Sequence, residues 1–252
     1  MPHKIKKILI TRPQASGEKL AQQLNSAGFS TLCQPLNTYQ KTSNEAEIRQ
    51  HLSQYQPNVL IFVSVAAVEY AQQQLNLVLW QQLSAINTVI AVGPTTQQAL
   101  KKYNIESSCP STFDSEGMLS LPIFNRPTLS PYQVTIIRGE SGREHLATSL
   151  KVKGATVSYL PVYEKIWLNL AEQQAQQWHQ QEINCIVVTS NAFLKKLVQL
   201  IDITDNYWKN TCLWLVVSER IAENATTLGL NNVVNTNGAT DQAIINTLLK
   251  ME

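Results

Sequence analysis

Hydrophobic and polar positions alternate between two periods along this chain. Residues 7–11 form a short apolar run of strand length, whereas in residues 16–27 the apolar side chains, such as Leu20 and Leu24, recur at helical spacing. Residues 29–34 form a second apolar run, which ends at a proline. The pattern therefore predicts a strand, a helix and a second strand at the start of the chain.

The same alternation continues further along the sequence. Apolar runs predict strands near residues 59–63 and 86–92, and each is followed directly by a helical pattern. A short strand is expected near residues 105–108, and then a helix opened by Ser115. Because strands and helices alternate, we expect an α/β fold with parallel sheets covered by helices on both faces.

The two halves of the chain are related by a nearly constant offset. Residues 9–36 match residues 135–162 at an offset of 126, and residues 91–96 match residues 216–221 at an offset of 125. A constant offset indicates an internal duplication, in which each half is one copy of the same β/α unit. The matched pairs include Ile10 and Ile136, Arg12 and Arg138, Leu24 and Leu150, Gly28 and Gly154, and Ser64 and Ser190.

A chain of 252 residues normally forms two domains, and the periodicity allows two ways of dividing it. A simple division would separate residues 1–126 from residues 127–252. In a crossed division, the chain would pass twice between the domains. The hydrophobic pattern leaves both divisions open. The segments of the crossed division are 1–35 with 167–252 as one domain, 41–160 as the other, and 36–40 and 161–166 as linkers.

Composition and charge narrow the classes of function. The 20 basic and 18 acidic residues give a net charge of +2, which creates no large field to hold nucleic acid or an anionic membrane. No apolar run approaches the roughly 18 residues of a membrane span. The N-terminal apolar run is too short for a signal peptide, so we expect a cytoplasmic protein.

The sequence contains no motif for a metal or an organic cofactor. The four cysteines form no C-x-x-C pair, so we expect reduced thiols that are mostly buried, and the four histidines show no metal-ligand spacing. The glycine-containing segments at 93–96 and 138–142 lack both the dinucleotide fingerprint and a phosphate-loop lysine. No nucleophile elbow occurs.

Candidate binding groups follow the predicted strands. Ligands of open parallel sheets bind beyond the carboxyl ends of the strands, where helix N-termini attract anions. Here these turns carry hydroxyls, amides and four of the six arginines, which predicts an anion-binding array. The ordinary alternative is that the hydroxyls cap helices and the arginines pair with nearby glutamates. The turn residues are Arg12, Ser64, Thr95, Thr96, Arg138, Gly139, Ser141, Arg143, Ser190, Asn191, Ser218 and Arg220.

Six segments, in this order, resemble those of the uroporphyrinogen-III synthase family over essentially the full chain. The resemblance implies two flavodoxin-like parallel-sheet domains joined by a two-stranded linker, with the chain crossing between domains. It therefore favours the crossed division. The segments are ITRP at 10–13, a strand ending in Ser at 61–67, AVGPTTQQAL at 91–100, DSEGMLSL at 114–121, IIRGESGREHLATSLKVKGATVSYLPVYEK at 136–165 and VVTSNAFLKKL at 187–197.

The resemblance also implies an activity. The family cyclises hydroxymethylbilane, a linear tetrapyrrole with eight carboxylates, with inversion of ring D through a spiro intermediate and loss of water. This implies a cytoplasmic lyase of porphyrin and heme biosynthesis that needs no metal or organic cofactor. The expected partner is the small-molecule substrate, not nucleic acid or a membrane. We expect a monomer, and transient contact with the preceding pathway enzyme stays open.

The resemblance assigns catalysis to Tyr163. The family pattern places a tyrosine in this linker, facing the cleft between the domains, and a phenol can donate a hydrogen bond to the departing hydroxide. The duplication does not repeat this tyrosine, because Asn37 stands at the equivalent position. The turn residues would bind the acetate and propionate groups, with Arg12 and Arg138 as carboxylate clamps.

Two positions depart from the family pattern. Val65 stands where an asparagine-like residue is common, although Asn191 keeps it in the second copy, and Glu219 stands where small residues or proline are common. An acidic side chain beside a polyanion is unfavourable, so we expect Glu219 to point away. Two other interpretations stay open: a two-lobed anion-binding protein without catalysis, and a flavodoxin-like signalling module, which would need clustered acidic residues at its strand ends.

Overall fold

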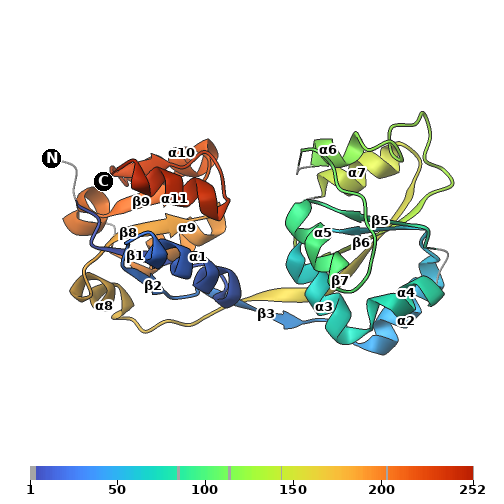
Figure 1. The fold of residues 1–252 in the computed structure, drawn as a ribbon, viewed down its shortest axis with the longest axis horizontal. Coiled ribbons are helices and arrows are strands. Elements are labelled where there is room, and N and C mark those ends of the chain that lie inside the picture. Colours follow the sequence, from blue (N-terminus) through green and yellow to red (C-terminus); the bar gives the residue numbers. More distant parts are fainter. Residues whose placement is uncertain (1–3, 84–85, 113–114, 143, 203, 252) are drawn as a thin grey trace. The chain divides into compact units, whose positions relative to one another are not determined.

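The computed structural model forms two compact units (Figure 1). Unit 1 comprises Met1–Thr38 and Ile166–Glu252, and unit 2 comprises Tyr39–Lys165. The chain passes from unit 1 to unit 2 after Thr38 and returns after Lys165, so the predicted fold class, with its crossing chain, is confirmed. The residues that the structure describes are 4–83, 86–112, 115–142, 144–202 and 204–251.

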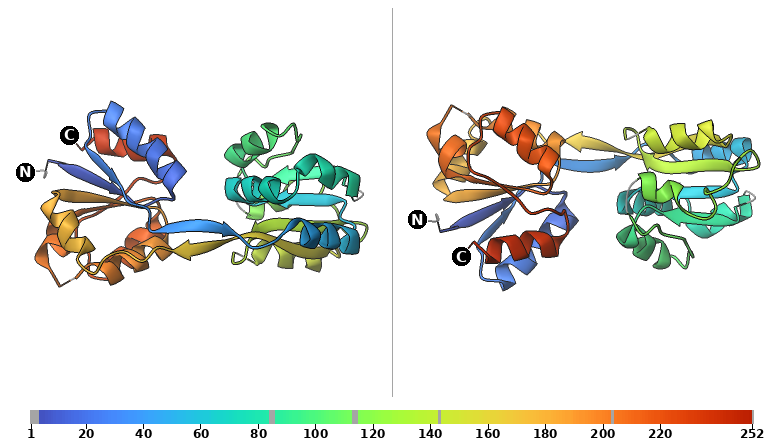
Figure 2. Two further views of the ribbon diagram at one scale, coloured as in Figure 1. Left: turned by 90° about the horizontal axis from the view of Figure 1, so that it is seen from below. Right: turned by 90° about the horizontal axis from the view of Figure 1, so that it is seen from above.

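Unit 1 is built on a parallel sheet with the strand order β10-β9-β8-β1-β2. Figure 2 shows α1 and α11 on one side of this sheet. The strands are β1 (Lys7–Ile10), β2 (Thr31–Cys33), β8 (Ile183–Val188), β9 (Leu213–Val216) and β10 (Val233–Asn235). The helices are α1 (Gln14–Ser26), α8 (Gln174–Gln180), α9 (Asn191–Leu200), the π-helix η1 (Tyr207–Thr211), α10 (Glu219–Thr227) and α11 (Asp241–Leu249).

Unit 2 is built on a sheet with the order β3-β7-β6-β4-β5, in which β4 to β7 pair in parallel. The strands are β3 (Asn37–Lys41), β4 (Val59–Phe62), β5 (Thr88–Ala91), β6 (Gln133–Gly139) and β7 (Thr156–Trp167). The helices are α2 (Glu45–Tyr55), α3 (Val65–Gln74), α4 (Leu77–Leu83), α5 (Pro94–Lys101), α6 (Ser115–Leu119) and α7 (His145–Val152).

The two sheets repeat one strand order, as the sequence duplication predicts. The order β2-β1-β8-β9 in unit 1 corresponds to β7-β6-β4-β5 in unit 2, because β1 and β6 begin the two copies. Ser64 and Ser190, which the offset pairs, both cap the helix that follows the equivalent strand. Equivalent turns therefore stand at equivalent strand ends in the two units.

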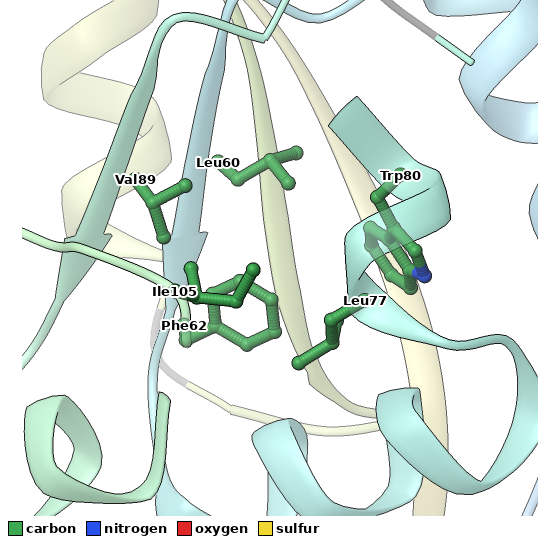
Figure 3. Close-up of a pocket in the computed structure, with 6 residues that line it drawn as sticks. All are labelled: Leu60, Phe62, Leu77, Trp80, Val89 and Ile105. Atoms are coloured by element: carbon green, nitrogen blue, oxygen red, sulfur yellow. The ribbon is translucent and has the colours of Figure 1, made fainter. Parts of the chain in front are cut away.

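The sheet of unit 2 has an apolar core on each face, because side chains alternate along its strands. Leu60 and Phe62 face the core formed with α2 to α5, whereas Val59 and Ile61 face the core formed with α6 and α7 (Figure 1). The first core contains a cavity of about 10 Å³ whose exposed lining is entirely apolar and offers no polar partner to a water. Figure 3 shows the six side chains that line it.

Three segments differ from the prediction. The strand expected near residues 105–108 is wrong, because only a single bridge between Ile90 and Ser108 forms there. Glu106 and Ser107 give that segment few apolar side chains to bury. Helices α2 and α4 occupy stretches for which the sequence pattern predicted no separate helix. No described helix is both long enough and apolar enough to cross a membrane.

The four cysteines are free thiols, but only two of them are buried. Cys185 and Cys212 lie in the core of unit 1, and burial raises the pKa of the Cys185 thiol to about 12. Cys33 and Cys109 are half-buried, because they lie at the sheet edge and in a loop. The expectation of mostly buried thiols therefore fits Cys185 and Cys212 alone.

Replacing Asn44 by alanine tests the capping of α2. The Asn44 side chain accepts a hydrogen bond from the Glu47 backbone N–H at 3.1 Å, and the Glu47 carboxylate accepts one from the Asn44 N–H at 2.9 Å. Asn44→Ala removes the first bond, so we expect a loss of about 1 kcal/mol in the free energy of unfolding, measured by urea titration. The exposed Gln54→Ala on the same helix is the control; equal stability of both variants would contradict the capping role.

Candidate functional site

Three predicted site residues meet at the carboxyl edge of the unit 2 sheet. Ser64 follows β4, Gly139 ends β6 and Tyr163 lies in β7. Parallel strands bring their carboxyl ends to one edge of a sheet, and here the Ser64 Oγ and Tyr163 Oη atoms are 3.1 Å apart in a hydrogen bond. Gly139 is the register partner of Tyr163. The fold therefore joins residues that are about 100 positions apart in the sequence.

Gly139 allows the Tyr163 ring to lie against the backbone. A Cβ atom at position 139 would stand 2.8 Å from Cε2 of Tyr163, which is too close for any side chain. Beyond this contact, the backbone N–H of Glu140 donates to the Tyr163 carbonyl at 2.9 Å. Because Gly139 has no side chain, one side of the Tyr163 ring can pack directly against the backbone of β6.

Two further tyrosines surround the Tyr163 ring. The ring centroid of Tyr39 lies 5.0 Å away in an edge-on arrangement, and that of Tyr70 lies 5.7 Å away. The Tyr70 hydroxyl donates to the Tyr39 carbonyl at 2.7 Å, and burial raises the pKa of Tyr70, which keeps this phenol a donor. Sequence reasoning missed Tyr70, because no motif or spacing links it to Tyr163.

The hydroxyl residues in the turns of unit 2 differ in how far their side chains are exposed and free to contact a ligand. Ser64 caps α3, since its Oγ accepts from the Ala67 N–H at 3.0 Å, and it still reaches Tyr163. Thr95 is exposed at the start of α5, whereas Thr96 is 2% exposed and faces the interior. Ser141 is exposed in the turn after β6. The predicted Arg143 lies outside the described residues.

Arg138 is buried and already has a carboxylate partner. Its Nη1 lies 2.9 Å from a Glu144 carboxylate oxygen, its Nε donates to the Gly139 carbonyl at 3.2 Å, and its guanidinium lies 4.6 Å from the Tyr159 ring centroid. The Tyr159 hydroxyl donates to the other Glu144 oxygen. Burial and this bond raise the pKa of Tyr159 to about 12, and the bonds from Tyr159 and Arg138 lower the pKa of Glu144.

In unit 1, Arg12 is paired in the same way. Its Nη1 lies 2.5 Å from an Asp241 carboxylate oxygen, and its Nη2 donates to the Ala239 carbonyl at 2.9 Å. Asp241 is the first residue of α11, so this pair joins the turn after β1 to a helix N-terminus. Both predicted arginine clamps thus have acidic partners within their own units.

The hydroxyl and amide candidates of unit 1 stand at two further helix starts. Ser190 caps α9 through the Phe193 N–H at 3.3 Å, whereas Ser218, at the N-cap of α10, makes no side-chain capping bond. Asn191 Oδ1 is buried without a hydrogen-bond partner in the described part of the chain. The Glu219 carboxylate accepts from the Asn235 amide at 3.0 Å.

Each unit therefore presents donors at the carboxyl edge of its sheet. In unit 2 these are the phenol of Tyr163, the hydroxyls of Ser64 and Thr95, and the backbone N–H groups at the start of α5. In unit 1 they are the hydroxyl of Ser218 and the start of α9. Uncharged donors at helix N-termini suit carboxylates, and the phenol adds a proton donor.

Comparison with known proteins gives one family. The model of the family described as "Uroporphyrinogen-III synthase HemD" matches residues 18–246. Uroporphyrinogen-III synthase of Escherichia coli (strain K12) is 29% identical over 248 residues, which cover 96% of this chain and 99% of that protein. The enzyme of the same name from Salmonella typhimurium (strain LT2) is 29% identical over 251 residues, covering 96% of this chain and 99% of its own length.

Solved structures show the same fold. The crystal structure of uroporphyrinogen-III synthetase from Helicobacter pylori 26695 superposes with a TM-score of 0.65 at 16% identity, covering 98% of this chain and 99% of that one. A mutant uroporphyrinogen III synthase from the extremely thermophilic bacterium Thermus thermophilus gives a TM-score of 0.61 at 14% identity, covering 98% and 100%. At these identities, the likeness concerns the fold alone.

Replacing Glu144 by glutamine tests the Arg138 cluster. The pKa of Glu144 is lowered in the folded state, so its contribution to stability is present above the ordinary carboxyl pKa and is lost as the pH falls through the lowered value. We expect Glu144→Gln to lower the urea midpoint at pH 7, and the difference from the unmodified protein to disappear as the pH falls through the lowered pKa of Glu144. Glu140→Gln, at an exposed carboxylate in the same turn, is the control; a difference independent of pH would contradict the account.

Proposed function

The chain belongs to the uroporphyrinogen-III synthase family, and on that premise we propose that it closes hydroxymethylbilane into the type III tetrapyrrole ring. The match to the family model over residues 18–246 is the observation that carries this function. The reaction breaks the bond between the terminal carbon and its hydroxyl group, which leaves as water. It forms a carbon–carbon bond that closes the ring, with ring D inverted, and the ring D carbon that makes this bond loses its proton, which balances the proton taken up by the departing hydroxide.

The chemistry explains why positioning matters more than a large set of catalytic groups. Loss of hydroxide, assisted by a pyrrole nitrogen, leaves a cation-like azafulvene. Ring D attacks this carbon through its own substituted position, which gives a spiro intermediate that fragments and closes again with ring D inverted. The unguided bilane closes at the nearer position instead. Holding the reacting carbons in place can supply several kcal/mol of the barrier reduction.

Tyr163 is proposed to donate a hydrogen bond, and then a proton, to the departing hydroxide. Its hydrogen bond to Ser64 and its contact with the Gly139 backbone support this role, because they hold the phenol in one orientation. Ser64 can accept a hydrogen bond from the phenol in the resting state, or donate one to the phenol oxygen once the phenol proton has moved to the hydroxide. A positioned proton donor contributes typically about 10²–10⁴-fold in rate.

The remaining turn residues are proposed to bind the acetate and propionate groups. Exposure of Thr95 and Ser141, and the uncapped hydroxyl of Ser218, support contacts from those side chains. Thr96 and Gly139 would contribute backbone N–H groups. Arg12 and Arg138 would bind substrate only by exchanging their present carboxylate partners, so we assign them first to the shape of their turns. The remaining proposed contacts are Ser64, Ser190 and Asn191.

The reaction eliminates water, so the proposal places the protein among the hydro-lyases. No step of this reaction requires a metal or an organic cofactor. We also propose that the protein acts in the cytoplasm as a monomer and that the preceding pathway enzyme delivers the bilane by transient contact. These assignments rest on the chemistry of the family and not on a particular contact.

The isomer of the product tests the proposed function. The protein is incubated with freshly prepared hydroxymethylbilane, the products are oxidised, and the type I and type III porphyrins are separated by chromatography. We expect type III to dominate with the protein and type I to dominate without it. An anion-binding protein without catalysis would leave the isomer ratio at the value of the protein-free reaction, which would contradict the proposal.

Tyr163→Phe tests the proton donor. The ring and its packing are kept while the hydroxyl is lost, so we expect type III formation to slow by at least about tenfold, towards the 10²–10⁴-fold typical of a lost acid. The melting temperature should change little. Tyr55→Phe, on the half-exposed face of α2, is the matched control with an expected rate equal to that of the unmodified protein. Undiminished turnover in Tyr163→Phe would refute the assigned role.

A further inference from the structure

Strand β7 carries one extra residue beside Tyr163. In the parallel register with β6, Pro161 pairs with Arg138 and Tyr163 pairs with Gly139, so Val162 has no partner of its own. Such an extra residue is a β-bulge, which changes the side to which the next side chain points. Accordingly, the consecutive residues Val162 and Tyr163 both pack against the same apolar core. The bulge is what turns Tyr163 towards Ser64.

The Val162 carbonyl at the bulge accepts a hydrogen bond from a side chain of helix α3. The Gln74 side-chain amide donates to this carbonyl at 2.8 Å, which is shorter than the 3.4 Å contact from the Thr42 backbone N–H. The Val162 carbonyl belongs to the peptide group that joins Val162 to Tyr163. Gln74 therefore restrains the backbone immediately before Tyr163.

The same helix holds the neighbouring strand. Tyr70, one turn before Gln74, donates its hydroxyl to the Tyr39 carbonyl of β3 at 2.7 Å, and its ring packs on both Tyr39 and Tyr163. Gln74 also donates to the Tyr70 carbonyl at 2.7 Å. Helix α3 is therefore hydrogen-bonded to β3 and β7, the two strands that carry Tyr39 and Tyr163.

The hydrogen bonds of Gln74 position the backbone at Val162, although the side chain is not the one that would stabilise the fold most. It is 9% exposed, and its amide nitrogen makes two short hydrogen bonds, but its Oε1 is buried with no partner in the part of the chain that the structure describes. A buried acceptor without a partner destabilises a fold, whereas an unbranched apolar side chain of similar length would avoid that cost. The unpaired Oε1 of Gln74 therefore lowers the stability of the fold at the same side chain whose amide nitrogen holds the Val162 carbonyl.

We infer that Gln74 and Tyr70 are positioning residues, which hold the bulge at Val162 and the strand β3 so that the Tyr163 phenol keeps its orientation. The inference rests on the proposed function only in so far as it concerns the rate. Its structural part, the orientation of the Tyr163 ring, can be measured without substrate. Gln74 and Tyr70 themselves need not contact the substrate.

Gln74→Met tests the inference, with the exposed Gln73→Met on the same helix as the matched control. Three readouts are compared: the melting temperature, kcat and KM for type III formation, and the ¹⁹F spectrum of protein with 3-fluorotyrosine at position 163 only. For Gln74→Met we expect a melting temperature close to that of the unmodified protein, because the loss of two hydrogen bonds offsets the removal of the unpaired oxygen. We also expect a kcat lowered at least tenfold with KM within twofold, and a shifted or broadened fluorine resonance. Gln73→Met should leave all three unchanged.

A purely structural role for Gln74 would give another result. A lower melting temperature with an unshifted fluorine resonance and an unchanged kcat would overturn the inference. If Gln74→Met does not fold, Tyr70→Phe repeats the test, because it removes only the bond to Tyr39 and keeps the ring. Tyr103→Phe is its control, since the Tyr103 hydroxyl on the same apolar core donates to the Glu69 carboxylate and not to the backbone of β3.

A double-mutant cycle separates this inference from the proposed role of Tyr163. If Gln74 acts through Tyr163, Gln74→Met should have little further effect on kcat in the Tyr163→Phe background. Additive losses would show that Gln74 does not act through the phenol and would overturn the inference. If Tyr163→Phe keeps full activity while Gln74→Met still shifts the fluorine resonance, the role of Tyr163 fails and the positioning stands.

Discussion

The register between β6 and β7 at their carboxyl ends is the constraint on which the candidate site depends. Gly139 and Tyr163 pair across these strands, and the one extra residue at Val162 turns the tyrosine towards Ser64. A side chain at position 139 would collide with the Tyr163 ring, so the glycine and the bulge act together. This local geometry supports the catalytic proposal for Tyr163, because it gives the phenol a hydrogen-bond partner and a fixed orientation.

Much of the fold could be predicted from the sequence, because parallel β/α units leave a strong pattern. The offset that pairs Ile10 with Ile136 places β1 and β6 at equivalent positions of their sheets, and the pairing of Ser64 with Ser190 identifies two helix caps. The hydrophobic pattern could not choose between a simple and a crossed division, since both bury the same apolar runs. The family resemblance made that choice.

The details of the site were less accessible, since they depend on contacts between distant segments. A bulge is set by the pairing of two strands, so neither Val162 nor the amide of Gln74 carries a local signal. The pairing of Arg12 with Asp241 joins residues 229 positions apart, which is why Arg12 looked available as a carboxylate clamp. Asn44 and Glu47 did carry a local signal, a capping box, which would have predicted α2.

The most direct test of the account is a crystal structure with an unreactive bilane in which a methyl group replaces the terminal hydroxymethyl group. The methyl carbon marks the atom from which hydroxide would depart. The account predicts that Tyr163 Oη lies within roughly 4 Å of this carbon, still bonded to Ser64, so that a hydroxyl group there would be within hydrogen-bond reach. A bilane whose methyl end lies far from Tyr163, with the phenol facing a carboxylate or solvent, would contradict it.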